Sequence, residues 1–408
     1  MLALQSNTEI NKIKIQLSKD INRELQEILC WWMKYTVMPG KKDFFSEVSY
    51  QNNQSDKNER GLVLYARLLW TFSTVCQHNY QEAYLETANL AYEKMYSHFW
   101  DVDYGGFLWS TGVLADKKQA YGHAFALYAL TAYYGLTKRE DILHQIKELY
   151  AIIESKFYDC RYGGYFEAFG KDWSFVEDVR LSEKDDNEVK SMNTHLHLIE
   201  AYASLYKINP QDAVREKIIH LLQLFKTHII NNKTFHLQLF FNEQWQSTSK
   251  LISYGHDIEA AWLLQQCAET VQSAEWVDYY KYMAIEITNA ASKGLDKDGG
   301  LWYEYNPVTQ SLIFEKHSWP QAEALVGFYN AYQITGNLQY LSKAVNSWGF
   351  IKNHIKDKQG GEWFWGITSD YSIIKNKKAG FWKCPYHNSR ACLEIIIRLK
   401  GELQENHL

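Results

Sequence analysis

The segment DVDYGGFLWS, residues 101–110, contains a pair of glycines that follow an aspartate and lie between aromatic residues. Glycine readily adopts positive φ, and aromatic residues favour strands, so the segment predicts a tight turn that enters a short hairpin. Three other segments repeat the pattern: DCRYGGYFEA at 159–168, DKDGGLWYEY at 296–305 and DKQGGEWFWG at 357–366. Such self-similarity indicates a repeat architecture.

The spacing of the glycine pairs gives the length of the repeat. Gly163 follows Gly105 by 58 residues, and Gly360 follows Gly299 by 61 residues. The interval of 136 residues between Gly163 and Gly299 is about two periods. A degenerate turn, NNKTFHLQLFFNEQW, lies near its middle at 231–245, and a further one, PGKKDFFSEV, occupies 39–48. The chain is therefore predicted to contain six turns.

Between these turns the sequence is helical in pattern. Six segments are apolar nearly all round, which is typical of buried helices: 60–75, 121–136, 193–208, 254–268, 318–334 and 388–402. A more amphipathic helix precedes each turn, as in QEAYLETANLAYEKMYSHF at 81–99. Six units of two helices and a hairpin predict an all-α fold, an (α/α)6 barrel with an inner and an outer ring, formed by one domain over residues 1–408. The alternative is an open solenoid, but no polar capping repeat is evident.

Composition narrows the class of protein. The chain has 408 residues, a net charge of −5 and an aromatic content of 15%. No basic field is present to attract nucleic acid or an anionic membrane, whereas abundant aromatic residues suit sugar binding. The six cysteines include no CxxC pair, and neither a signal peptide nor a membrane span is indicated. We expect a reduced, cytoplasmic monomer without nucleic-acid or membrane partners.

The apolar inner segments begin with polar side chains, as in SYGHDIEAAWLL at 253–264. In a closed barrel these beginnings face one side, so their side chains are expected to converge on one mouth. The residues concerned are Arg67, His123, Asn193, His195, His197, His256, Glu259, His317, Trp319, Glu323, His387, Asn388 and Arg390.

Several of these residues also allow a purely structural interpretation. His123 is expected to be a helix cap or a hydrogen-bonded core residue. His256 and Glu259 are three apart and share a helix face, so the carboxylate either fixes the imidazole tautomer or only complements the helix dipole. Asp257 is expected to be such a dipole partner. Arg67 is either functional or part of a structural ion pair.

Metal and phosphate sites are not predicted. His195 and His197 are two apart, so only one of them can point into the bore of the barrel, and no HExxH motif is present. The glycine pairs lack the strand and helix that flank a phosphate-binding loop.

Six ordered motifs resemble the N-acylglucosamine 2-epimerase superfamily, and within it the branch of the cellobiose 2-epimerases. They are ARLLWTFS, YGHAFALYAL, SMNTHLHLIEAY, SYGHDIEAAWLL, KHSWPQAEALVGFYNAY and FWKCPYHNSRACLE. The resemblance spans nearly the whole chain. It implies the (α/α)6 barrel and reversible inversion at C2 of the reducing-end glucose of a small disaccharide, without a cofactor.

The resemblance also implies roles for individual residues. Of the catalytic residues, His256 and His387 would form the acid/base pair, while Arg67 and His197 would contact the O1/O2 region of the sugar. The substrate-binding residues would be Asn193, Glu259, Trp319, Trp382, Tyr121 and Asp185.

The implied chemistry suits these residue types. Inversion at C2 requires removal of a proton from one face of the opened sugar and its return to the other face, which two histidines can perform near neutral pH. Three alternatives remain at this stage: a monosaccharide epimerase or mannose isomerase, a sugar-binding barrel without catalysis, and an inverting glycoside hydrolase. The hydrolase would need two carboxylates roughly 6.5 to 9.5 Å apart.

Overall fold

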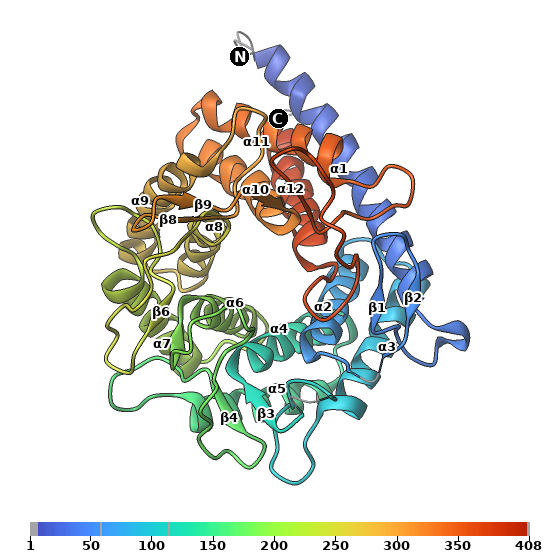
Figure 1. Cartoon of the computed structure of the whole chain (residues 1–408), viewed down its shortest axis with the longest axis vertical. Coiled ribbons are helices and arrows are strands. Elements are labelled where there is room, and N and C mark those ends of the chain that lie inside the picture. Colours follow the sequence, from blue (N-terminus) through green and yellow to red (C-terminus); the bar gives the residue numbers. More distant parts are fainter. Residues whose placement is uncertain (1–6, 58, 113–114, 406–408) are drawn as a thin grey trace.

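The computed structural model describes residues 7–57, 59–112 and 115–405, with side chains to residue 402. Within these ranges twelve α-helices form two concentric rings (Figure 1). The inner ring consists of α2 (Leu62–His78), α4 (Ala120–Thr137), α6 (Met192–Ile208), α8 (Tyr254–Thr270), α10 (Ser318–Thr335) and α12 (Tyr386–Glu405). The outer ring consists of α1 (Asn7–Thr36), α3 (Glu82–Phe99), α5 (Glu140–Ile152), α7 (Asp212–Leu224), α9 (Ala274–Ala291) and α11 (Leu338–Phe350). The predicted (α/α)6 barrel is confirmed, and α12 closes the ring by packing against α2 and α10.

The inner and outer helices differ in how much of their surface is buried, as the sequence patterns predict. The inner helix α8 is buried on nearly every side, and its first half alone buries Ile258 and Trp262. The outer helix α5 buries one stripe, formed by Ile142, Ile146 and Leu149. Short helical segments supplement these helices: π-helical η2 (Ile153–Phe157), η3 (Phe225–Ile229) and η5 (Ile351–Ile355), and 3-10 helical η1 (Pro39–Lys41) and η4 (Ser292–Gly294).

All six predicted turns are present, and each is closed by one antiparallel β-bridge. The bridges are Val37↔Phe44, Trp100↔Phe107, Tyr158↔Tyr165, Ile230↔Leu237, Leu295↔Leu301 and Lys356↔Trp363. Gly105 and Gly106 have φ of 72° and 79°, which explains the glycine pair. In the degenerate turn at 231–245 the non-glycine residue Phe235 adopts a φ of 61° instead.

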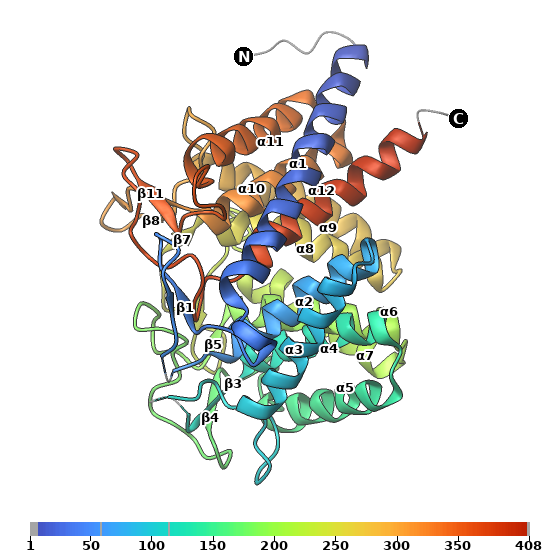
Figure 2. The ribbon, with the colours of Figure 1, turned by 90° about the vertical axis from the view of Figure 1, so that its right-hand side faces the viewer.

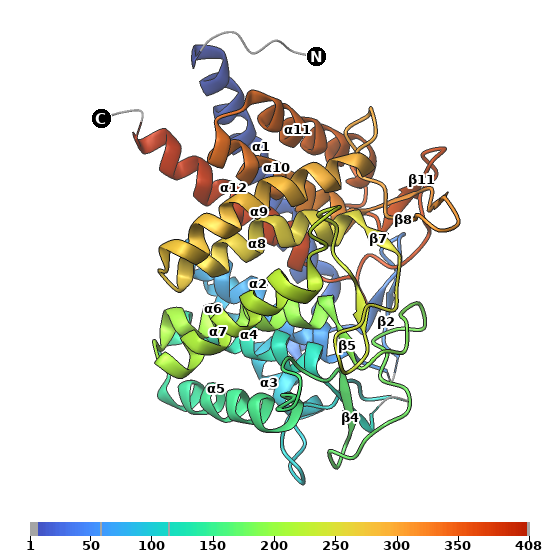
Figure 3. The same ribbon diagram turned by 90° about the vertical axis from the view of Figure 1, so that its left-hand side faces the viewer.

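Short antiparallel strands gather at the end of the barrel where the inner helices begin (Figures 2 and 3). The pairs are β1 (Glu47–Val48) with β2 (Gln54–Ser55), β3 (Lys117–Gln119) with β4 (Ala168–Gly170), β5 (Lys190–Ser191) with β6 (Phe240–Phe241), and β10 (Glu315–His317) with β11 (Gly366–Thr368). β8 (Glu304–Asn306) lies between β7 (Ile252–Ser253) and β9 (Ser311–Leu312). The strand before an inner helix thus commonly pairs with the strand that follows the next turn, which links successive repeats.

The aspartate of each glycine-pair turn forms an ion pair with a buried lysine that the sequence analysis did not identify. The Nζ–Oδ distances are 2.8 Å for Lys118–Asp101, 2.7 Å for Lys190–Asp159, 2.7 Å for Lys316–Asp296 and 2.6 Å for Lys378–Asp357. Lysine is rarely buried unless it is paired, so these aspartates fix the turns onto the strand layer.

Replacing Lys190 by methionine should lower the free energy of unfolding by about 3–5 kcal/mol, because it leaves Asp159 buried without a counter-charge. The Lys190 side chain is 0% exposed, and its ammonium also donates to the carbonyls of Gly163 and Glu243. Urea denaturation measures the effect, with the exposed Lys233→Met as control. A loss no larger than that of the control would contradict this role.

The fourth residue of several inner helices holds the preceding turn in place. The amide N–H of Phe107 donates to Nε2 of His123 at 3.0 Å, and that of Tyr165 donates to Nε2 of His195 at 2.9 Å. The structural interpretation of His123 is therefore confirmed.

Asp257 occupies the same position in α8 and has more contacts than a helix-dipole partner needs. It lies in the first turn of the helix as expected, but its carboxylate also accepts from the amide of Leu237 at 2.8 Å and bonds to Nδ1 of His236 at 2.7 Å. Its contacts are therefore those of a turn anchor.

All six cysteines are free thiols. Among the described helices, none combines the length and the apolar character that a membrane span requires.

Candidate active site

A cavity of about 480 Å³ opens where the inner helices begin, and all six of them contribute to its walls. This volume falls within the usual range for small-molecule sites. The lining includes all ten residues predicted for the site: Arg67, Tyr121, Asp185, Asn193, His197, His256, Glu259, Trp319, Trp382 and His387. The expected convergence of polar helix beginnings on one mouth is confirmed for nine of the thirteen residues named, whereas His123, His195, Glu323 and Arg390 do not line the cavity. Of the two histidines in HLH, His197 lines the cavity, whereas His195 binds the turn.

Arg67 is a buried cation without a carboxylate partner. Its Nη2 donates to the Tyr121 hydroxyl at 2.8 Å, and its Nη1 to Sγ of Cys384 at 3.4 Å. The guanidinium lies over the rings of Phe125 and Tyr386, at 4.1 and 4.8 Å from their centroids. No carboxylate oxygen of the described residues lies within 4.0 Å, so the alternative of a structural ion pair is wrong. An unpaired buried cation of this kind favours an anion in the cavity.

Two imidazoles reach the cavity from α8 and α12. Nδ1 of His256 bonds to Oγ of Ser253 at 2.8 Å, and Nδ1 of His387 bonds to Oε1 of Glu323 at 2.7 Å. Both rings contact Trp319, with centroid distances of 4.8 and 5.4 Å. Because each Nδ1 is engaged by the protein, Nε2 is the nitrogen left to act on a ligand.

Glu259 does not fix the tautomer of His256, although the two share a helix face. Its carboxylate instead forms an ion pair with Arg390 and lies 4.0 Å from Nδ1 of His387. A buried guanidinium is a stronger hydrogen-bond partner for a carboxylate than a neutral imidazole is. The hydrogen-bond partner of Nδ1 of His256 is the Ser253 hydroxyl.

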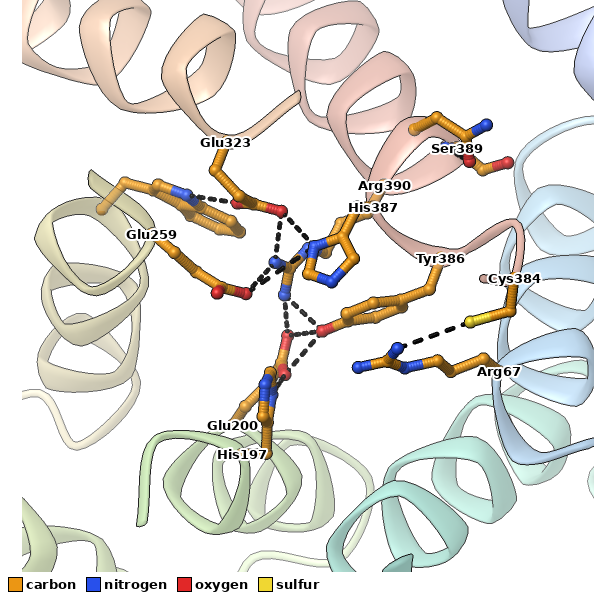
Figure 4. Close-up of polar contacts among 12 residues, drawn as sticks. Arg67, His197, Glu200, Glu259, Glu323, Cys384, Tyr386, His387, Ser389 and Arg390 are labelled. Carbon is orange, nitrogen blue, oxygen red and sulfur yellow. Dashed lines mark hydrogen bonds and ion pairs between the residues drawn. The ribbon is translucent and has the colours of Figure 1, made fainter. Parts of the chain in front are cut away.

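Arg390 and three carboxylates form a buried group beside the cavity, here called the Arg390 cluster (Figure 4). Nη1 donates to Glu200 at 2.6 Å, and Nη2 donates to Glu323 at 2.8 Å and also to Glu259. Glu200 in turn bonds to Nδ1 of His197 at 3.0 Å. The cluster thus connects residues of α6, α8, α10 and α12.

Sequence reasoning missed part of this site. Glu200 was not identified, and Glu323 and Arg390 were recognised only as polar helix beginnings. A signal was available, because Glu200 and Arg390 each follow a cavity histidine by three residues and so share its helix face. Loops contribute further lining residues without any periodic pattern: Leu181, Ser182, Glu183, Lys184, Tyr303, Trp363, Trp365, Asn376, Lys383 and Cys384.

Burial controls the charge state of the two histidines. It lowers the pKa of His256 to about 4 and that of His387 well below its ordinary value, so burial favours the neutral, proton-accepting form of each ring at pH 7. Burial raises the pKa of Glu323, whereas for Glu200 the charge of Arg390 outweighs burial and lowers the pKa to about 2.

The donor atoms of Glu259, Glu323 and His387 lie within 4.8 Å of one another, close enough for a cation. Nη2 of Arg390 already donates to both carboxylates, so its guanidinium occupies the position of that positive charge. This donor set therefore fits an arginine that neutralises carboxylates better than a metal.

Comparison with known proteins places the chain in a family. The model of the N-acylglucosamine 2-epimerase (GlcNAc 2-epimerase) family matches residues 43–391. The chain belongs to this family. A relative in Bacteroides fragilis named cellobiose 2-epimerase is 39% identical over 93% of this chain and 98% of its own. The resemblance noted in the sequence is thus confirmed.

Other similar proteins show the range of similarity. A structure of cellobiose 2-epimerase from Spirochaeta thermophila has a TM-score of 0.89 and 36% identity, with coverage of 96% of this chain and 98% of its own. A D-mannose isomerase of Marinomonas mediterranea is 24% identical over 89% of this chain and 93% of its own.

Proposed function

We propose that the protein is a carbohydrate epimerase that inverts C2 of the reducing-end glucose of β-1,4-linked disaccharides, with cellobiose as its model substrate. The observation that carries this proposal is the placement of two neutral imidazoles and one unpaired guanidinium around a single cavity. Membership of the family and the similarity to proteins named cellobiose 2-epimerase support it.

The proposed reaction begins with the opened, aldehyde form of the reducing-end sugar. One histidine of the pair His256 and His387 removes the C2 proton, which the neighbouring carbonyl makes acidic, and the electrons move into a cis-enediolate. The other histidine gives a proton to the opposite face of C2, and ring closure completes the inversion. One ring must therefore be neutral while the other carries a proton, and the roles exchange in the reverse direction.

The remaining residues have roles that follow from their charge and placement. Arg67 stabilises the negative oxygen of the enediolate, since its guanidinium has no competing carboxylate. His197, held by Glu200, contacts the O1/O2 region from α6. Asn193 adds an amide oxygen that has no hydrogen-bond partner among the described residues. No electron carrier is needed in this scheme, because the aldehyde itself accepts the electron pair.

Aromatic side chains at the cavity provide surfaces for two sugar rings. Trp319 contacts both imidazoles and would pack against the reacting sugar. Trp382 packs against Tyr121 and Trp109, at 6.2 and 5.5 Å between centroids, and is placed to support the second ring. Asp185, whose carboxylate accepts from Ser182, would bind a sugar hydroxyl.

The alternative of an inverting hydrolase fits this site poorly. The two carboxylates nearest the histidines, Glu259 and Glu323, present oxygens within 4.8 Å of each other and share the guanidinium of Arg390. Inverting hydrolases need carboxyl groups roughly 6.5 to 9.5 Å apart, with a water between them.

Product analysis tests the proposal. The purified protein is incubated with cellobiose, and in parallel with glucose, mannose and N-acetylglucosamine, and the products are separated by anion-exchange chromatography. We expect cellobiose to yield glucosyl-mannose. Release of free glucose would indicate hydrolysis, and conversion of the monosaccharides alone would assign the site to another branch of the family.

Activity should persist well below pH 6.5. The base must be neutral, and burial lowers the pKa of His256 to about 4, so acid protonates this ring only near that pH. The acid limb of kcat/KM, measured from pH 3.5 to 9, should therefore lie closer to 4 than to the ordinary histidine value of about 6.5. A limb at or above pH 6.5 would contradict the neutral state of this base.

A further inference from the structure

Arg390 does not line the cavity, yet it contacts carboxylates from three other inner helices (Figure 4). It follows His387 by three residues on α12, so both side chains project from the same helix face. Its side chain is 2% exposed, and its guanidinium donates to Glu200 of α6, Glu259 of α8 and Glu323 of α10. A residue that only anchored α12 would need one such partner.

Two of these three carboxylates also face His387. Nδ1 of His387 lies 2.7 Å from Glu323 and 4.0 Å from Glu259. The charged or titratable groups that act on His387 from the surrounding helices are Arg67 of α2, His197 of α6, Glu259 of α8, Glu323 of α10 and Arg390 of its own helix. The charge of the Arg390 cluster is therefore felt directly by the imidazole.

The ionised side chains around His387 have a net formal charge of −1. Glu200, Glu259 and Glu323 carry three negative charges when ionised, and Arg390 and Arg67 carry two positive charges. A proton on His387 makes this group neutral. Without Arg390, three buried carboxylates would hold that proton too tightly for an acid that must release it in each turnover.

We propose that Arg390 is a positioning residue that determines how readily His387 releases its proton, because its guanidinium divides one positive charge among Glu200, Glu259 and Glu323. This inference rests on the proposed function, in which His387 is one of the acid/base pair. The influences on His387 agree with it: burial, the largest, lowers its pKa, Glu259 raises the pKa, and Arg67 and Arg390 lower it.

Direct titration of His387 tests this role without requiring turnover. The full-length protein is labelled with 13C at histidine Cε1, and the His387 resonance is assigned by its absence from His387→Gln. The variants are Arg390→Met, Arg390→Lys and the double variant Arg390→Met/Glu200→Gln. The control is Glu394→Gln, which removes a carboxylate one turn further along α12 that pairs with Arg398.

We expect Arg390→Met to raise the pKa of His387 by about one to two pH units, as for one unit charge at several ångströms in a partly buried site. The double variant loses one negative charge together with the positive one. Most of the increase in the pKa of His387 should therefore be reversed. Arg390→Lys should shift the pKa in the same direction by less, because the compact ammonium keeps the positive charge but lacks the planar, forked guanidinium that spans the three carboxylates. Glu394→Gln should leave the titration unchanged.

An identical pKa of His387 in the wild type and in Arg390→Lys would overturn the inference. Arg390→Lys keeps the buried positive charge, so it can be tested even if Arg390→Met does not fold. The inference would also be overturned if the pKa of His387 shifted no more in Arg390→Met than in Glu394→Gln. The alkaline limb of kcat/KM should move with the pKa of His387. If the wild type shows no epimerisation while the titrations shift as expected, the proposed function fails and the charge assignment stands.

Discussion

Alanine at His387 or at His256 should lower kcat for cellobiose epimerisation by about 10²- to 10⁴-fold, the range typical of a lost general acid or base. Inversion needs a proton donor on one face of C2 and an acceptor on the other, so neither ring replaces its partner. The exposed His144→Ala is the matched control and should retain full activity. Circular dichroism and thermal unfolding of each variant would show that the barrel is intact.

The single variants should also separate exchange from inversion. A protein with one remaining histidine can remove and return the C2 proton on the same face. We expect one variant to exchange the C2 proton of the gluco epimer with solvent, and the other to exchange that of the manno epimer, each without net inversion. Undiminished inversion by either variant would contradict the two-histidine scheme.

Replacing Arg67 by methionine should abolish most activity without destabilising the fold. The loss of the charge that faces the enediolate should reduce kcat by about 10²- to 10³-fold, as for the removal of a transition-state hydrogen-bond donor. Because no carboxylate oxygen of the described residues lies within 4.0 Å of Arg67, its removal breaks no direct ion pair, so the melting temperature should be unchanged or higher.

Arg67→Lys provides the comparison for this effect. It retains the positive charge but loses the forked geometry, so it should recover part of kcat. A marked fall in the melting temperature of Arg67→Met, of the size expected for a broken buried ion pair, would indicate a structural role instead. Differential scanning calorimetry and initial rates with cellobiose measure the two effects on the same samples.

The sequence predicted the architecture because the architecture is periodic. Glycine is the residue that most readily adopts positive φ, as Gly105 and Gly106 do. Turns with this backbone conformation can therefore be recognised in the sequence by their glycine pairs. The degenerate turn with Phe235 at positive φ was located only because the period required it. The glycine requirement of the turns and the length of the repeat were thus sufficient to predict the barrel.

Contacts between distant segments could not be predicted in the same way. The pairing of Glu259 with Arg390 joins residues 131 positions apart, and spacing along α8 suggested His256 instead. Lys190 lies outside the periodic helical segments and was not identified, yet it is buried against Asp159. Helical spacing tells which side chains share a face, but the strongest partner on the facing helix decides which of them form a pair.

The most direct test of the account is proton NMR of cellobiose incubated with the wild-type protein in D₂O. The two-histidine scheme predicts a new reducing-end mannose residue that carries deuterium at C2, because the proton returned to the opposite face comes from a histidine that exchanges with solvent. Formation of the mannose epimer with protium retained at C2 throughout, or recovery of cellobiose without any exchange, would contradict it.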